Sequence, residues 1–242
     1  MTSIRSLLSR IPGSPIRPRV HFLHIGKTGG TAVRAALEGT RSRRYRLTLH
    51  SHGTRLEHLP PEDLAIAFVR DPVARFVSGF YSRQRRGRPR YDFAWSPEEE
   101  VAFQRFSSPD ELSRALSSRD SEERKAAQTA MESIQHVRDH QTAWFGPDPQ
   151  RAIQNGRLLF VGSQEHLGED FERLKGLLGI DAAVGLPGDP VASHENPDGL
   201  DRSLSPEARE NLFLWYETDF RTLGTLAEAF PWLPAYEGSE LG

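Results

Sequence analysis

A glycine-rich segment near the start of the chain has the composition of an anion-binding turn. The segment FLHIGKTGGT places Lys27, Thr28, Gly29 and Gly30 between an apolar run and a helical pattern that begins at Thr31. Such a turn directs successive backbone N–H groups and a helix N-terminus at one point, which suits a phosphate or a sulfate. The lysine and the two threonines add an ammonium group and hydroxyls, so they favour anion binding over an ordinary strand-to-helix turn with incidental glycines.

This turn differs from the nucleoside-triphosphate loop known as Walker A. That motif has a glycine five positions before the glycine of its Gly-Lys pair, and His21 stands there. An NTPase also usually supplies an acidic residue at the end of a strand to help hold Mg²⁺. Asp71 follows a predicted strand, but Pro72 comes next, a pattern that indicates a helix cap. An ATP-dependent small-molecule kinase is therefore a weakened alternative.

A second motif, FVRDPVARFVSGFYSR, follows another apolar run and opens an amphipathic helix. Together with HIGKTGGT it resembles the two signature segments of the sulfotransferase superfamily that uses 3′-phosphoadenosine 5′-phosphosulfate (PAPS). It is most similar to the carbohydrate branch, which includes the heparan sulfate 2-O-sulfotransferases. The resemblance covers residues 20–90 well and continues more loosely through 141–146, 160–174 and the final helix. It implies transfer of a sulfuryl group from PAPS to a hydroxyl of a carbohydrate or another small hydroxylated metabolite.

The resemblance implies roles for both motifs in holding PAPS. The first segment would bind the 5′-phosphosulfate through Lys27, Thr28, Gly29, Gly30 and Thr31. The second binds the 3′-phosphate, in that family, through an Arg at a strand end and a Ser eight residues later, a spacing that Arg70 and Ser78 share. A guanidinium at the carboxyl end of a parallel strand lies where such sheets bind ligands and can grip a phosphate with two hydrogen bonds. Without the family pattern, Ser78 is equally well explained as a small residue where a helix packs on the sheet.

Two histidines, His50 and His52, follow a predicted strand. Alternate residues of a strand face the same side, so both imidazoles could converge on one site, although two exposed loop histidines are the alternative. A neutral imidazole is suited to take a proton from a hydroxyl near pH 7. The 2-O-sulfotransferases carry a His-x-His between the two nucleotide segments, which implies His52 as the catalytic base and His50 as a supporting or substrate-contacting residue. Other branches use a glutamate, so Glu57 and Glu38 remain candidates.

A tract of arginines follows the second motif, at Arg83, Arg85, Arg86, Arg88 and Arg90. It is typical of a solvated basic loop, and it would also suit an anionic acceptor such as a uronate-containing glycan. We find no nucleic-acid motif and no interleaved stacking aromatics, so nucleic acid is not an expected partner. A non-catalytic module that binds nucleotide or anionic glycan is a further alternative. By analogy with relatives, the loop at 194–197 would close over the nucleotide.

Short apolar runs alternate with helical patterns along the chain. The predicted strands cover residues 20–25, 45–50, 65–69 and 157–162, and the predicted helices cover 31–39, 73–81, 165–178 and 205–223. Such alternation favours a parallel sheet covered on both faces. With the resemblance, the expected fold is α/β: a P-loop-like three-layer sandwich with a central parallel sheet and a helical insertion at about 96–140. Residues 1–19 are expected to form a flexible lead-in and 20–242 a single domain. His21 and His24, in the first predicted strand, are interpreted as satisfied buried histidines, with a position of His24 facing the nucleotide as the alternative.

Composition excludes several classes of site. The 242 residues carry a net charge of −2 and contain no cysteine, which rules out disulfides, thiolate metal sites and a cysteine nucleophile. No cluster of His, Asp and Glu has convincing metal-binding spacing, and sulfuryl transfer need not use a metal, so none is expected. No apolar run approaches the ~20 residues of a membrane span. We therefore expect a cytoplasmic location and no integral membrane association.

Overall fold

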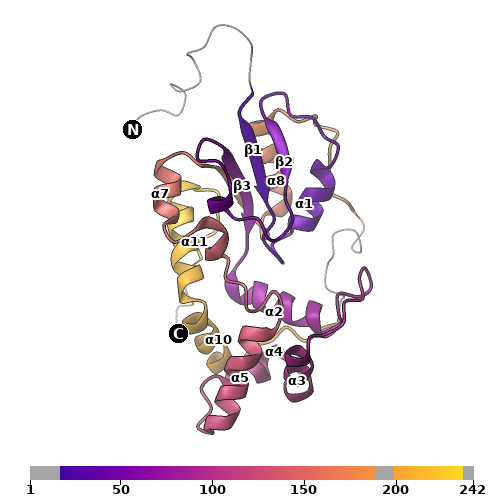
Figure 1. The fold of residues 1–242 in the computed structure, drawn as a ribbon, viewed down its shortest axis with the longest axis vertical. Coiled ribbons are helices and arrows are strands. Elements are labelled where there is room, and N and C mark those ends of the chain that lie inside the picture. Colours follow the sequence, from indigo (N-terminus) through magenta and orange to yellow (C-terminus); the bar gives the residue numbers. More distant parts are fainter. Residues whose placement is uncertain (1–16, 189–198, 237–242) are drawn as a thin grey trace.

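A four-stranded, all-parallel sheet forms the centre of the molecule (Figure 1). The computed structural model describes residues 17–188 and 199–236, so the loop predicted at 194–197 and most of the predicted lead-in lie outside the described residues. The strand order is β2-β1-β3-β4. The strands are β1 (Arg19–Leu23), β2 (Arg46–Leu49), β3 (Leu64–Val69) and β4 (Leu158–Ser163).

Each strand is followed by at least one helix, and several helices lie between β3 and β4 in the sequence. They are α1 (Gly30–Leu37), η2 (Leu56–His58), α2 (Pro72–Gln84), α3 (Pro97–Arg105), α4 (Pro109–Ala115), α5 (Ser121–Ser133), α6 (Thr142–Phe145), α7 (Pro149–Gln154), α8 (Leu167–Leu178), α10 (Pro206–Trp215) and α11 (Glu217–Ala229). The predicted α/β class with a central parallel sheet is confirmed. The segment predicted as a helical insertion contains α3, α4 and α5.

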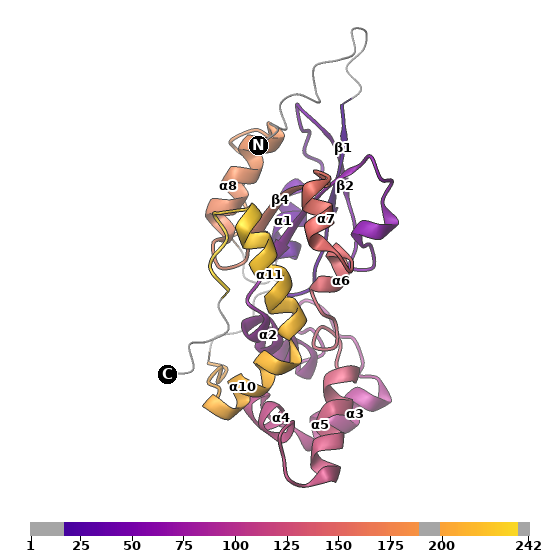
Figure 2. The same ribbon diagram turned by 90° about the vertical axis from the view of Figure 1, so that its left-hand side faces the viewer.

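The two faces of the sheet bury separate hydrophobic cores. Along β3, Ala65, Ala67 and Val69 point into one core while Ile66 and Phe68 point into the other, as the two-residue period of a strand requires. Helices α1 and α8 cover the second face, and α7 and α11 lie over the first (Figure 2). Helix α2 and the group α3, α4, α5 and α10 lie beyond the carboxyl ends of the strands (Figure 1).

Three helices begin after a serine that caps them. Ser96, Ser108 and Ser205 each accept a hydrogen bond from a backbone N–H in the first turn of the following helix, with proline next in sequence. Asp71 caps α2 in the same way, accepting from the Ala74 N–H at 2.7 Å. The predicted capping role of Asp71 is therefore confirmed. Among the described helices, none is long and apolar enough to cross a membrane.

Several predicted boundaries differ from the structure, and the first strand ends at Leu23, so His24 follows it. The second strand ends at Leu49, so residues 50–52 belong to a turn and strand alternation does not apply to them. The last helix is two helices, α10 and α11, that meet at Tyr216. The hydroxyl of this fully buried tyrosine donates to the Val137 carbonyl at 2.7 Å, a contact with a distant segment that no local pattern reveals.

Candidate active site

A cavity of about 760 Å³ lies at the carboxyl ends of the strands. Residues that follow all four strands line it, including Lys27 after β1, His52 after β2, Arg70 after β3 and Gln164 after β4. Most of the residues singled out from the sequence line this one cavity: Lys27, Gly29, Gly30, Thr31, His52, Arg70 and Ser78. Ligands of parallel α/β sheets bind at this end of the strands.

The loop between β1 and α1 has the backbone conformation of a tight anion-binding turn. Lys27 and Gly29 have φ angles of 68° and 77°, and Gly29 is the N-cap of α1. A Cβ at Gly30 would lie 2.4 Å from the His24 ring, so only glycine fits beside that imidazole. Thr28 is fully buried and does not line the cavity, because its hydroxyl donates to the Ile25 carbonyl at 3.0 Å. Thr28 therefore holds the turn in shape.

Lys27 lies close to several positively charged side chains. Burial, followed by the charges of Arg85, Arg70 and Arg75, lowers the pKa of its ammonium group to about 7. Each of these causes disfavours the charged form of Lys27. A bound anion would act in the opposite direction, so the loop is electrostatically prepared for a negatively charged group.

The backbone of Arg70 is held in place before any ligand arrives. The side-chain amide of Gln141 accepts from the Arg70 N–H at 3.0 Å and donates to the Arg70 carbonyl at 2.7 Å. Asp219 in turn accepts from the Gln141 N–H. One guanidinium N–H of Arg70 donates to the Lys27 carbonyl at 3.3 Å, while its buried Nε has no partner in the described part of the chain. A buried donor without an acceptor is costly, and a phosphate oxygen would satisfy it.

Sequence reasoning missed Arg75, whose side chain supports the glycine-rich loop through a hydrogen bond to the Gly26 carbonyl. Its side chain is 1% exposed, and it donates to the Gly26 carbonyl at 2.9 Å and to the Asp139 carbonyl at 2.6 Å. The signal was a charged residue inside the apolar stripe of α2, between Val73 and Phe76. A buried cation on such a face indicates a specific partner.

The hydrogen bonding of His52 suits a general base. Its Nδ1 lies 3.1 Å from the His24 carbonyl oxygen. A carbonyl can only accept, so Nδ1 carries the proton and Nε2 keeps its lone pair. Burial is the largest influence on His52 and lowers the pKa of the ring below its usual value. His52 is therefore neutral at pH 7 and lines the cavity.

His50 does not converge with His52 on the cavity. Its Nε2 lies 2.7 Å from Nδ1 of His21, whose Nε2 lies 2.9 Å from an Asp63 oxygen, and the two rings stack with centroids 5.0 Å apart. The shared-face expectation is wrong because the strand ends before both residues. His21 is a satisfied buried histidine, as predicted.

His24 is buried as well, but it lies beside the site. Its ring centroid is 4.0 Å from that of His52, and it lines the cavity. Burial, then the charges of His52 and Arg34, lowers the pKa of His24 to about 3. Of the two reserve bases, Glu38 lines the cavity, whereas Glu57 lies on η2 with its side chain exposed.

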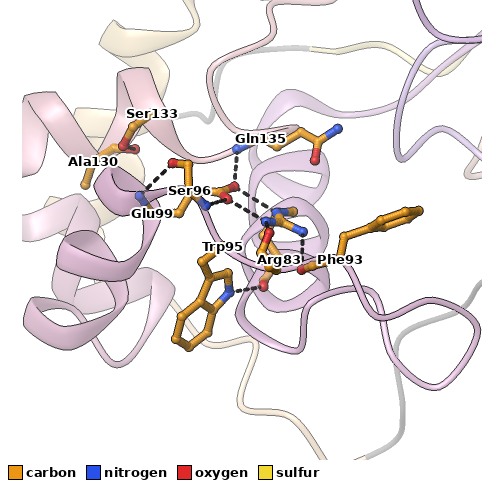
Figure 3. Close-up of polar contacts among 9 residues, drawn as sticks. Arg83, Phe93, Trp95, Ser96, Glu99, Ala130, Ser133 and Gln135 are labelled. Carbon is orange, nitrogen blue, oxygen red and sulfur yellow. Dashed lines mark hydrogen bonds and ion pairs between the residues drawn. The ribbon is translucent and has the colours of Figure 1, made fainter.

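The arginine tract divides into residues with different surroundings. Arg83 is buried and bound to both carboxylate oxygens of Glu99, which also accepts the Gln135 and Ser96 N–H groups (Figure 3). The other members make separate contacts. Arg85 donates to the Arg88 carbonyl, Arg86 lies over the Trp95 ring, Arg88 pairs with Asp92, and Arg90 lies over the Tyr91 ring. Of this tract, Arg83 and Arg90 line the cavity.

Comparison with known proteins agrees with this geometry. The model of the sulfotransferase family matches residues 17–224, so the chain belongs to that family. No curated protein and no solved structure matches the chain. Family membership makes the protein a transferase of sulfuryl groups, in keeping with its parallel α/β sheet.

Proposed function

We propose that this protein transfers the sulfuryl group of PAPS to a hydroxyl of a carbohydrate or another small hydroxylated metabolite. One observation carries the proposal. A single cavity brings together the glycine-rich loop, the partnerless buried Nε of Arg70 and the proton-accepting imidazole of His52. Sulfuryl transfer needs an anion-binding group that holds the donor on one side of the sulfur atom. It also needs a proton acceptor for the hydroxyl on the other side.

The donor half is formed by the two motifs. Lys27 and the backbone of Gly29, Gly30 and Thr31 would hold the 5′-phosphosulfate, and Arg70 with Ser78 would hold the 3′-phosphate. The orphaned Nε of Arg70 and the lowered pKa of Lys27 both fit an anionic ligand at this place. PAPS supplies an activated sulfuryl group when it is bound there.

In the reaction, His52 would accept the proton of the acceptor hydroxyl at Nε2 as the oxygen forms its bond to sulfur. The bond from sulfur to the phosphate oxygen breaks, and PAP (3′-phosphoadenosine 5′-phosphate) leaves. Charge develops on that phosphate, and the ammonium of Lys27 and the loop N–H groups would stabilise it. The backbone hydrogen bond to His24 fixes the tautomer of His52 for this task.

We propose that the acceptor is anionic and binds toward the arginine tract. The cavity is lined by six basic residues and one acidic residue, Glu38. The basic residues are Lys27, Arg34, Arg70, Arg83, Arg90 and Arg202. Arg83 forms a buried ion pair with Glu99. Arg90 is therefore the member of the tract best placed to bind an acceptor.

Calorimetric titration with PAP, adenosine 5′-phosphosulfate and ATP–Mg²⁺ tests the donor site. We expect tight binding of PAP and much weaker binding of adenosine 5′-phosphosulfate, which lacks the 3′-phosphate. Arg70→Ala should raise the Kd for PAP about a hundredfold, because charge-assisted hydrogen bonds to the phosphate are lost.

Arg221→Ala is the matched control, since this exposed arginine on α11 pairs with Glu217 on the surface and lies outside the cavity lining. It should bind PAP like the wild type. Binding of ATP–Mg²⁺ with indifference to PAP would overturn the proposal in favour of a kinase. Tight PAP binding without turnover on any acceptor would favour a non-catalytic binding module.

A further inference from the structure

His136 lies in the cavity although nothing in its sequence surroundings distinguished it. It follows α5 by three residues and lines the cavity with Lys27 and His52. Its backbone has a φ of 69°, in the left-handed region. A residue other than glycine persists there only when its surroundings hold it, and such strain clusters at functional sites.

Both neighbours of His136 are anchored to distant parts of the fold. The N–H of Gln135 donates to Glu99 at 3.0 Å, and Glu99 is locked to Arg83 of α2 (Figure 3). On the other side, the Val137 carbonyl accepts from the buried Tyr216 hydroxyl. Val137 itself is fully buried. These contacts fix the strained backbone and therefore the position of the imidazole.

The ring of His136 lies where the two nucleotide-binding motifs meet. A Cβ at Gly26 would be 2.7 Å from its Nδ1, and a Cβ at Gly79 would be 3.2 Å from the His136 Cβ. Gly26 precedes Lys27 in the loop, and Gly79 follows Ser78 on α2. The ring also meets His52 edge to face, with centroids 5.8 Å apart. Gly26 thus leaves space for the ring of His136, and Gly79 leaves space for its Cβ and backbone.

The ring nitrogens of His136 can form hydrogen bonds with a ligand in the cavity. The ring lines the cavity beside Lys27 and His52, where its nitrogens can meet a ligand. Burial, followed by the positive charge of Lys27 and the nearby His52, holds the pKa of His136 well below its ordinary value. A neutral imidazole keeps one N–H donor and one acceptor nitrogen.

We propose that His136 is a further catalytic residue, whose ring N–H donates a hydrogen bond to an oxygen of the sulfuryl group held by the loop. The inference rests on the proposed function, because it takes the loop beside Gly26 as the place of the 5′-phosphosulfate. No proton is transferred in this contact. The ring orients the sulfuryl group between Lys27 and His52 for transfer.

The test compares the affinities for PAPS and PAP, which differ by the sulfuryl group alone. In His136→Ala, the Kd for PAPS should rise about tenfold, as expected for a lost hydrogen bond to a charged group, while the Kd for PAP stays within about twofold of wild type. His136→Gln, which keeps an N–H donor, should restore much of the PAPS affinity. His136→Gly relieves the left-handed strain but removes the donor, so it should fold normally and still lose PAPS affinity.

The control is His58→Ala, since His58 lies on η2, is exposed and is outside the cavity lining. It should leave both affinities unchanged. Unchanged PAPS affinity in His136→Ala would overturn the inference, as would equal losses of PAP and PAPS affinity. Failure of the wild-type protein to bind either nucleotide would instead overturn the proposed function, so the two failures can be distinguished.

Discussion

The hydrogen bond from His52 to the His24 carbonyl decides which histidine nitrogen is available for chemistry. It leaves Nε2 unprotonated, and the lowered pKa of the ring keeps it so at neutral pH. His50 is also a histidine, two positions away, but its Nε2 is hydrogen-bonded to His21. Neighbouring groups, more than residue type, therefore distinguish the two imidazoles.

The pH dependence of sulfuryl transfer should follow His52. A base acts in its deprotonated form, so kcat measured with PAPS saturating, when the bound anion keeps Lys27 charged, should fall on the acid side with a midpoint below the ordinary value of 6.5. His52→Ala should lower kcat about a thousandfold and leave the Kd for PAP nearly unchanged. A pH–rate profile with a panel of hydroxylated acceptors checks this. A loss as large in His50→Ala, with His52→Ala still active, would move the role of base to His50.

At the scale of elements, Glu99 joins three segments that are distant in sequence. It binds Arg83 of α2, caps the start of α3 through the Ser96 N–H, and receives the Gln135 N–H after α5 (Figure 3). Burial would raise the pKa of Glu99, but these hydrogen bonds and the charge of Arg83 outweigh it and hold the pKa below 4.5. The Glu99 carboxylate is therefore one of the links between the helical group beyond the sheet and the cavity wall.

Replacing Glu99 should destabilise the fold. Glu99→Gln leaves the buried guanidinium of Arg83 without its counter-charge, which should reduce the free energy of unfolding by about 3 kcal/mol. A chain of this size should then lose about 10 °C in Tm. Glu100→Gln, exposed in the same helical turn, is the matched control and should change Tm by little.

The effect of Glu99→Gln should depend on pH. Because the folded-state pKa of Glu99 is lowered, its contribution to stability is present above pH 4.5 and is lost as the pH falls through the folded value. Chemical denaturation of both proteins at neutral and acid pH measures this difference. A gap in stability that stays constant down to pH 3 would contradict the ionic role of Glu99.

The elements of the fold were largely predictable because their signals are local. Short buried runs identified the strands, the Asp71-Pro72 pair indicated the start of a helix, and the glycine-rich loop was recognisable after the first strand. The break at Tyr216 was not predictable, since it depends on a hydrogen bond to Val137. His136 was missed for the same reason, because tertiary contacts alone bring it to Gly26.

At the scale of the whole molecule, charge is unevenly distributed. The chain has a net charge of −2, yet the cavity wall is strongly basic. Low-dielectric walls of one sign concentrate field lines and attract oppositely charged ligands, an effect that salt weakens. The sequence showed the arginine tract but not which members reach the cavity, because Glu99 and Asp92 lie outside the tract.

This field gives a test of the acceptor class. Uronate-containing glycans should be sulfated with lower KM than neutral sugars, and added salt should narrow the difference. Arg90→Ala should raise the KM for the anionic acceptor about tenfold at low salt. Arg88→Ala is the control, since Arg88 pairs with Asp92 on the surface. Equal KM values for neutral and anionic acceptors would contradict the anionic assignment.

The position of Trp95 has a practical consequence. Its indole N–H donates to the Arg83 carbonyl, and the Arg86 guanidinium lies 4.6 Å from the ring centroid. The other three tryptophans, Trp144, Trp215 and Trp232, pack with the hydrophobic core. Indole emission responds to nearby charge and polarity, so the arginine tract carries its own optical reporter. An acceptor that moves the Arg86 guanidinium should therefore change the emission of Trp95, without an attached dye and before any chemistry takes place.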